Sequence, residues 1–318
     1  MNPIGGYFSL ELPLNEEYHK DAIKLNTGRN CIEYILRARK YIKVYIPYYT
    51  CDVTLEPICK LHIIYEFYHI NNDFELIDDI KLKQGEALIY VNYFGLKQQY
   101  IKSLAKKYGN QLIVDNTQAF YADHINGIDT FYTCRKYFGV PDGAYLYTDS
   151  FLNEKFEQDK SYERISFLTK RIDISPEAGY IDFREQSRNL IGQPIKMMSK
   201  LTLRLMQSID YDYVARRRIE NFNTIHSYLQ RTNCLKFYNE DAVPMAYPYY
   251  TRSKGLRERL INNNIYIPRY WPNVTTWTDE FSVESNFTNM LLPLPIDQRY
   301  GKTEMITIID VIKKFCNL

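Results

Sequence analysis

The chain has 318 residues, of which 45% are apolar and 25% are charged, a composition typical of a globular protein with a sizeable core. Its 40 basic and 38 acidic residues leave a net charge of +2, which indicates no general attraction to nucleic acid or to an anionic membrane. No apolar run approaches the roughly 18–20 residues that span a bilayer, and the first residues lack the pattern of a signal peptide. The six scattered cysteines form no C-x-x-C pair, and the five histidines show no metal-ligand spacing. We therefore expect a cytoplasmic protein without a metal site, in which any anion site is local.

The first half of the chain alternates helical and strand patterns. Residues 28–40 place Cys31, Ile32, Ile35 and Leu36 on one stripe, which predicts an amphipathic helix. Further helices are expected at 54–61 and 97–108, and strands at 42–47, 62–68, 87–92, 112–115, 130–133 and 144–148. Such alternation predicts a mainly parallel sheet of an α/β fold, in which ligands bind beyond the carboxyl ends of the strands.

The second half has a different pattern. Residues 195–231 predict a long helical stretch, broken or bent near 210–213. Shorter strands are expected at 243–250, 265–268 and 290–294, and helices at 253–262 and 303–315. We therefore predict a large domain over residues 1–210 and a smaller α+β domain over residues 211–318.

A glycine-containing turn, Thr27-Gly-Arg-Asn-Cys31, precedes the first helix. A turn of this kind at a helix N-terminus presents free backbone N–H groups and the positive end of the helix dipole, which suits a phosphate. The backbone amides of Gly28, Arg29 and Asn30 are the candidate donors. Plain helix capping by Thr27 or Asn30 would explain the same residues.

Two further segments follow strands at the ligand-binding edge. Asp115-Asn-Thr-Gln118 comes directly after a buried strand, so its carboxylate needs a cationic or donating partner, such as a protonated pyridine nitrogen. Gln118 could donate to a ring oxygen, although Asp115 could instead cap the next helix. Thr133-Cys-Arg-Lys136 places a lysine between a strand and a Gly/Pro loop, where it is either a Schiff-base lysine or part of a solvated Arg-Lys pair. Together, a phosphate turn, a strand-end aspartate and a lysine are the contacts that pyridoxal 5'-phosphate requires.

In this order the segments resemble those of the DegT/DnrJ/StrS family of pyridoxal-phosphate-dependent sugar aminotransferases. Residues 27–36 look like the family's "S-G-T-x-A-L…L" segment, 44–50 like its "E-V-I-x-P-x-x-T", 93–95 like its "h-x-Y-G" turn, and 114–119 like "E-D-A-A-Q-A". Residues 133–144 look like a shortened "S-F-x-x-x-K…G-E-G-G", and 292–300 like the "L-P-x-x-x" segment of the small domain. The resemblance implies the fold-type I, PLP-dependent transferase-like architecture and a homodimer.

The resemblance also implies roles for individual residues. Lys136 would be the catalytic lysine that binds the cofactor, Asp115 would meet the pyridine nitrogen, and Gln118 would lie near the ring. Thr133 stands where the family usually has serine, two residues closer to the lysine, and Cys51 stands where many members have an aromatic that stacks on the ring. The implied reaction transfers an amino group from glutamate to a keto-sugar, expected to be nucleotide-linked, in amino-sugar or surface-polysaccharide biosynthesis.

Several alternatives stay open at this point. The Cys51 and Thr133 departures favour a catalytically silent or repurposed homologue with a binding role. A glycosyltransferase or nucleotide-binding protein could share a doubly wound sheet, although the chain has no G-x-G-x-x-G and no Walker-type loop. A structural interaction protein is a further possibility, and some family members are dehydratases that usually carry histidine in place of the lysine.

Overall fold

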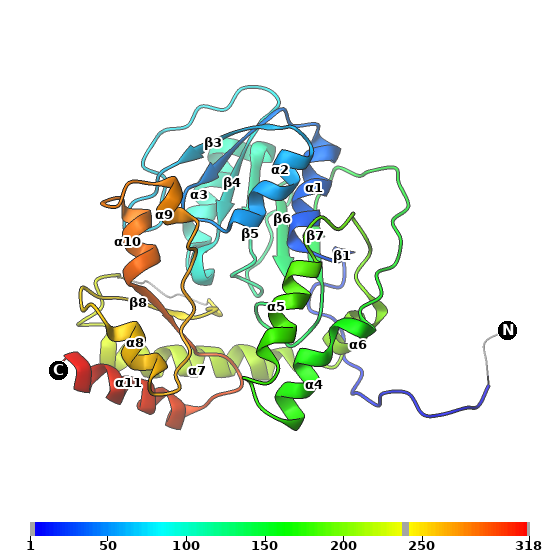
Figure 1. Ribbon diagram of the computed structural model, residues 1–318. Coiled ribbons are helices and arrows are strands. Elements are labelled where there is room, and N and C mark those ends of the chain that lie inside the picture. The colour runs from blue at the N-terminus through cyan, green and yellow to red at the C-terminus, as the bar shows by residue number, and fades with distance from the viewer. Residues whose placement is uncertain (1–3, 237–241, 317–318) are drawn as a thin grey trace.

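A seven-stranded sheet forms the centre of the computed structural model, which describes residues 4–236 and 242–316 (Figure 1). The strand order is β1-β7-β6-β5-β4-β2-β3. The strands are β1 (Ile23–Leu25), β2 (Lys43–Pro47), β3 (Ile64–Tyr68), β4 (Glu86–Val91), β5 (Leu112–Asp115), β6 (Asp129–Thr133) and β7 (Ala144–Tyr147). β2 to β6 run parallel, whereas β7 and β1 are antiparallel to their neighbours. The predicted mainly parallel sheet is confirmed.

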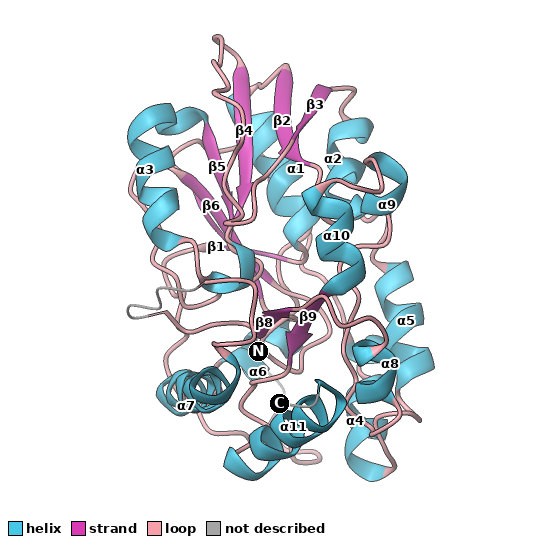
Figure 2. Cartoon of the chain, turned by 90° about the vertical axis from the view of Figure 1, so that its left-hand side faces the viewer, coloured by secondary structure: helices cyan, strands magenta, loops and turns pink. Residues whose placement is uncertain are grey.

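The sheet is buried on both faces, and alternate residues of its strands enter two separate cores. In β4, Leu88 and Tyr90 pack on the side of α3 (Gln98–Tyr108), while Ala87 and Ile89 pack on the side of α1 (Gly28–Arg39). Figure 2 shows α3 on one side of the sheet, with α1 and α2 (Leu55–Lys60) on the other. Burial on both faces explains why the central strands are continuous apolar runs rather than alternating ones.

Helix α1 forms as its sequence predicts. Cys31 and Ile35 are fully buried in the core on its side of the sheet. At its start, Thr27 has an extended backbone and its Oγ1 accepts a hydrogen bond from the Asn30 amide at 3.2 Å. At its end, Lys40 takes a left-handed conformation and its N–H donates to the Leu36 carbonyl. The first turn of α1 lies beside the carboxyl end of β6, because Gly28 is close to Thr133, the last residue of that strand.

The elements of the second half of the chain are α6 (Lys200–Met206), α7 (Tyr211–Leu229), β8 (Tyr247–Tyr250), α8 (Leu256–Ile261), α9 (Val274–Trp277), α10 (Val283–Met290), β9 (Leu291–Leu294) and α11 (Lys302–Cys316). Of these, α7, α8 and α11 pack with the two-stranded sheet β8–β9 in a separate core and form a smaller unit. The predicted break near 210 separates α6 from α7, and Asp210 caps α7 by accepting from the Tyr213 amide at 2.9 Å. In the described ranges no helix is long and apolar enough to cross a membrane.

The aromatic core joins the two halves of the chain. Trp271 and Phe287, from the second half, pack against Tyr49, with ring centroids 4.8 and 5.5 Å from its own. Phe287 also stacks on Phe74 at 4.6 Å. The boundary at residue 210 stays a prediction, because this shared core does not divide there.

The strand predicted at 265–268 is wrong. The segment is irregular, and its carbonyl groups are satisfied by a side chain instead of a neighbouring strand. The Arg257 guanidinium donates to the Ile267 carbonyl at 3.3 Å and to the Pro268 carbonyl at 2.6 Å. Pro268 also lacks the N–H that a strand partner would need. The helices α4 (Ser166–Asp173) and α5 (Tyr180–Asn189) were not predicted, since their apolar residues are few and largely exposed.

The buried residue His19 predicts how stability responds to acid. Its Nε2 lies 2.8 Å from the Phe120 carbonyl and its Nδ1 lies 3.2 Å from the Tyr147 hydroxyl, and burial lowers the pKa of the imidazole to about 4. The unfolded chain takes up this proton near pH 6.5, whereas the folded protein does not. Stability should therefore fall by up to about 3 kcal/mol between pH 6.5 and 4.

Urea unfolding at pH 7 and pH 4.5 measures this loss. The control is His19→Gln, which cannot titrate and should show a shallower pH dependence, whatever its stability at pH 7. Equal pH dependence in both proteins would show that His19 does not contribute.

Candidate active site

The ends of β5 and β6 and the start of α1 enclose a cavity of about 200 Å³. β5 and β6 are parallel neighbours, so Asp115 and Thr133, their last residues, lie at the same edge of the sheet. Six of the eight residues proposed from the sequence line this cavity: Gly28, Arg29, Cys51, Asp115, Thr133 and Lys136. The remaining two, Asn30 and Gln118, do not.

Asp115 is a buried carboxylate that has no counter-ion among the described residues. The residue is 7% exposed, and its Oδ1 accepts the Thr117 amide at 2.8 Å. Burial raises the pKa of the carboxyl group, while the hydrogen bond from Thr117 and the charge of Lys136 oppose the rise. Among the residues that the structure describes, no cation forms an ion pair with it. A buried carboxylate in this state is costly to the protein alone and would be stabilised by a donor inside the cavity.

Lys136 lies in the loop after β6, and it is exposed and lines the cavity. Its Nζ lies 5.9 Å from the ring centroids of both Tyr270 and Trp271. Within the described part of the chain this amine has no hydrogen bond or ion pair. The amine is therefore accessible to a ligand and lies in the same cavity as Asp115.

Thr133 and Gly28 lie close together in the wall of the cavity. A Cβ atom on Gly28 would lie 2.7 Å from the Thr133 methyl group, so only glycine fits there. The Thr133 hydroxyl is buried and has no hydrogen-bond partner in the described residues. In the first turn of α1, the Asn30 amide donates to Thr27 Oγ1. The amides of Gly28 and Arg29 have no acceptor among the described residues. A hydroxyl and two amides facing one cavity suit an oxyanion.

The side chains of Asn30, Gln118 and Arg29 form hydrogen bonds with other groups of the protein. Asn30 donates to the Asn26 side chain at 2.6 Å and to the Pro194 carbonyl at 2.8 Å. The Gln118 Oε1 accepts the Phe94 amide at 2.8 Å, while its Nε2 is buried and has no hydrogen-bond partner in the described residues. The Arg29 guanidinium forms an ion pair with Glu56 at 2.9 Å and donates to the Leu190 carbonyl, so only its backbone amide is free.

Two residues of the cavity wall that were not among the proposed cofactor ligands, Trp271 and Arg135, add an aromatic ring and a cation to it. Trp271 brings a buried aromatic ring to the cavity whose wall also contains Cys51. The local sequence around Trp271 does not predict its place at the cavity, because the residue lies in a distant irregular segment. Arg135 lines the cavity next to Lys136, and its position just after the end of a strand could have indicated this.

A glycine holds the lysine loop against the turn before α1. The Gly143 amide donates to the Asn26 carbonyl at 2.7 Å, and its carbonyl accepts the Cys134 amide at 3.0 Å. Its φ of +111° favours glycine, and an added Cβ would lie 2.9 Å from both Cys134 Sγ and Thr202 Cγ2. Gly143 thus couples the two walls of the cavity.

Gly143→Ala is expected to lower the free energy of unfolding by about 2 kcal/mol or more, because the methyl group meets buried atoms in a strained conformation. Urea unfolding measures the loss. Gly127→Ala is the matched control: its φ is +78°, but nothing lies within 4 Å of an added Cβ. An equal loss of unfolding free energy in the two variants would show that the close contacts of Gly143 do not contribute to stability.

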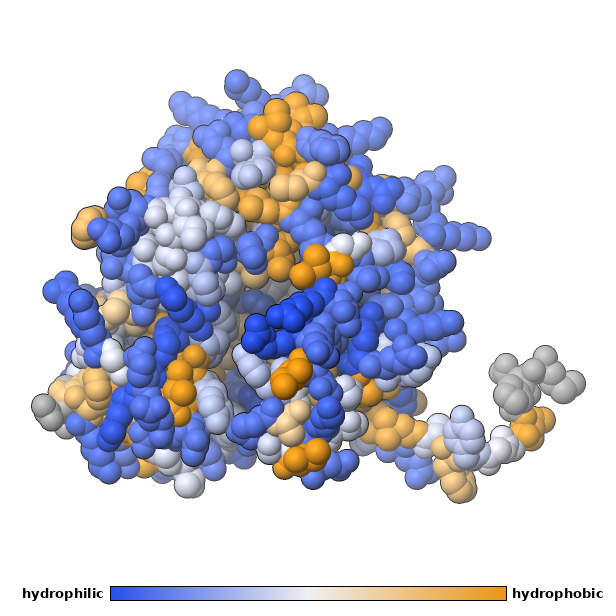
Figure 3. Space-filling view, in the orientation of Figure 1, coloured by the Kyte–Doolittle hydropathy of each residue, from blue (hydrophilic) through white to orange (hydrophobic). Residues whose placement is uncertain are grey.

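A second, larger cavity of about 680 Å³ adjoins the first, and Arg135 and Lys136 line both. It lies between the α4–α5 segment and the smaller unit, where Figure 3 shows the surface hollowed. Its lining contains four arginines and Lys136 but only one carboxylate, that of Asp297. This excess of positive charge favours an anionic ligand.

Comparison with known proteins gives the fold. No protein-family profile and no curated protein matches the chain. Among solved structures it is similar to S. venezuelae DesV in complex with a ketimine intermediate, with 17% identity, a TM-score of 0.63, and 92% of this chain covering 84% of that one. The PLP form of a sugar aminotransferase, Spr1654 from Streptococcus pneumoniae, gives 14% identity and a TM-score of 0.64 over 92% and 86% of the two chains. A GDP-4-keto-6-deoxymannose-3-dehydratase has 14% identity and a TM-score of 0.64, and the match covers 92% of this chain and 88% of that one.

The chain has the fold of the sugar aminotransferases. The α/β, fold-type I architecture inferred from the resemblance is thereby confirmed. In this sugar-aminotransferase fold the smaller cavity lies at the carboxyl ends of the parallel strands. The arginine-rich cavity lies beside it, and Lys136 stands where the two meet.

Proposed function

We propose that this protein is an aminotransferase that binds pyridoxal 5'-phosphate through Lys136 and transfers an amino group to a keto-sugar. One observation carries the proposal: the same cavity is lined by an amine, a buried carboxylate and a hydroxyl, and among the described residues the amine has no hydrogen bond or ion pair, the carboxylate has no cation and the hydroxyl has no hydrogen bond. Each of these groups lacks the partner that this cofactor would provide. The fold shared with proteins named as sugar aminotransferases supports the same reading.

The residues present fit the cofactor, which when bound supplies an electron sink for carbanion chemistry. Asp115 would face the pyridine nitrogen and hold a proton there, because its buried carboxylate needs a donor. The amides of Gly28 and Arg29, with Thr133 Oγ1, would hold the phosphate. Lys136 would attach to the aldehyde and then serve as the base that moves a proton at the substrate carbon. Trp271 would exclude water from the wall that Cys51 leaves open.

The larger cavity is the proposed place for the substrates. Its arginine-rich lining suits a nucleotide-linked sugar, and a neighbouring structure is named as an enzyme of a GDP-linked keto-sugar. Glutamate is the proposed amino donor, and the larger cavity also has room for its carboxylates. A homodimer is the proposed assembly, which light scattering of the purified protein would test.

A visible-range absorption spectrum tests the proposed function. Pyridoxal 5'-phosphate added to the purified protein should give a band of the covalently bound cofactor, and glutamate should then shift that band to shorter wavelength. Unchanged free-cofactor absorption would contradict the proposal. A bound cofactor that no amino donor converts would instead support a binding role.

A further inference from the structure

Arg135 is a half-buried cation that has no counter-ion among the described residues. Its guanidinium donates from Nη2 to the Ser187 hydroxyl at 3.0 Å and lies 5.5 Å from the centre of the Phe183 ring. Its Nε is buried and has no hydrogen-bond partner, and no carboxylate lies within ion-pair distance in the part of the chain that is described. Burial lowers the pKa of this group to about 10, and the nearby charge of Arg29 acts in the same direction. The protein alone therefore leaves a positive charge incompletely stabilised.

The other arginines of the two cavities are satisfied or solvated. Arg29 pairs with Glu56, and Arg299 pairs with Asp297 at 2.6 Å. Arg218 donates to the Met245 carbonyl at 3.0 Å and has further oxygen partners, while Arg171 is exposed. Of the described arginines that line these cavities, Arg135 alone has a buried guanidinium nitrogen without a hydrogen-bond partner.

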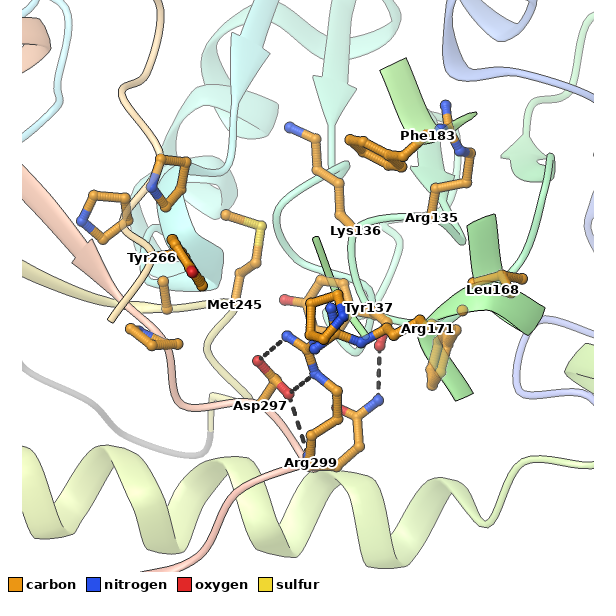
Figure 4. Close-up of a pocket in the computed structure, with 18 of the residues that line it drawn as sticks. Arg135, Lys136, Tyr137, Leu168, Arg171, Phe183, Met245, Tyr266, Asp297 and Arg299 are labelled. Atoms are coloured by element: carbon orange, nitrogen blue, oxygen red, sulfur yellow. Dashed lines mark hydrogen bonds and ion pairs between the residues drawn. The ribbon is translucent and has the colours of Figure 1, made fainter. Parts of the chain in front are cut away.

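Arg135 shares its cavity with the unpartnered Thr133 hydroxyl and the first turn of α1. Figure 4 shows the Arg135 and Lys136 side chains extending to the same side of the loop that carries them. A guanidinium offers several donors in one plane, and a phosphoryl group offers several acceptor oxygens with negative charge. A single oxyanion could therefore use all of these donors at once.

We propose that Arg135, with Thr133 Oγ1 and the amides at the start of α1, binds a phosphoryl group. The inference rests on the proposed function, because the cofactor phosphate and the diphosphate of a nucleotide-linked sugar both have this chemistry. Arg135 lines both cavities, so either source could reach it. The cofactor phosphate fits better, since Thr133 and the α1 turn line only the smaller cavity.

Binding measurements on the whole protein test this role. Titration calorimetry would compare wild type, Arg135→Gln and Arg135→Lys for pyridoxal 5'-phosphate, pyridoxal, inorganic phosphate and uridine diphosphate. Arg135→Gln should weaken pyridoxal 5'-phosphate at least about tenfold and should remove competition by inorganic phosphate, while pyridoxal binds as before. Arg135→Lys should recover part of the loss. Arg184→Gln, an exposed change on α5, should bind every probe like wild type.

The pattern of losses identifies the source of the phosphoryl group. Weakened pyridoxal 5'-phosphate with unchanged uridine diphosphate identifies the cofactor phosphate, and the reverse identifies the nucleotide. Unchanged binding of all phosphorylated probes in Arg135→Gln would overturn the proposal. Thr133→Val provides a second test should Arg135→Gln fold poorly: it is nearly isosteric and removes the hydroxyl, so it should weaken phosphate binding several-fold. Wild-type affinity in Thr133→Val would overturn the part assigned to that hydroxyl.

Borohydride reduction followed by mass spectrometry separates this inference from the proposed function. An adduct on Lys136 in wild type, with phosphate affinity equal in wild type and Arg135→Gln, would sustain the cofactor and reject the phosphoryl site. Phosphate binding that depends on Arg135, with no adduct on Lys136, would do the opposite.

Discussion

Replacing Lys136 by alanine is expected to abolish covalent attachment of pyridoxal 5'-phosphate and to slow amino transfer from glutamate by at least about 10³-fold. The reason is that the proposed site uses one amine twice, to attach the aldehyde and to move the proton. Within the described residues this amine has no hydrogen bond or ion pair, so its removal breaks no such contact. The free energy of unfolding should therefore change little. Single-turnover absorbance measurements with glutamate give the rate, and reduction with mass spectrometry locates the adduct.

A lysine far from the cavity provides the matched control. Lys102→Ala removes an exposed amine from α3 and should leave both the adduct and the rate unchanged. A small primary amine in solution should partly restore proton transfer in Lys136→Ala, because it can enter the cavity that the side chain leaves. An adduct that persists on another lysine in the variant would contradict the assignment of Lys136.

The sequence predicts those parts of the site that depend on local pattern. Asp115 and Thr133 are the last residues of buried strands, and parallel strands bring their carboxyl ends to one edge. Thr27 and Gly28 begin a helix whose apolar stripe fixes the face that it buries. Strand ends and helix starts are read from a few neighbouring residues, so these positions could be placed without knowing any distant contact.

The remaining parts of the site depend on contacts between distant segments. Gln118 has suitable spacing from Asp115, yet its Oε1 is taken by the Phe94 amide of another loop. Trp271 reaches the cavity through an irregular segment whose carbonyls are held by Arg257. Residue spacing in the sequence does not predict either contact, because each depends on how distant segments pack together.

Asp115→Asn is expected to change cofactor chemistry and protein stability in opposite directions. The amide keeps the shape and can still accept the Thr117 amide, but it carries no charge to hold a proton on the pyridine nitrogen. Amino transfer should therefore fall about 10²-fold or more, with covalent attachment to Lys136 retained. The cofactor-free variant should be at least as stable as wild type at pH 7, because it no longer buries a carboxylate without a cation.

The pH dependence of unfolding checks the physical cause. Burial raises the folded-state pKa of Asp115, so ionisation of this group costs the folded protein stability at neutral pH, and that cost disappears as the pH falls through the folded-state pKa. The stability difference between the cofactor-free variant and wild type should therefore narrow towards acid pH. Urea unfolding of both proteins from pH 7 to pH 4 measures that difference. A variant that is clearly less stable than wild type at pH 7 would show that the carboxylate is a structural element. Amino transfer at the wild-type rate would show that the carboxylate has no part in holding the ring.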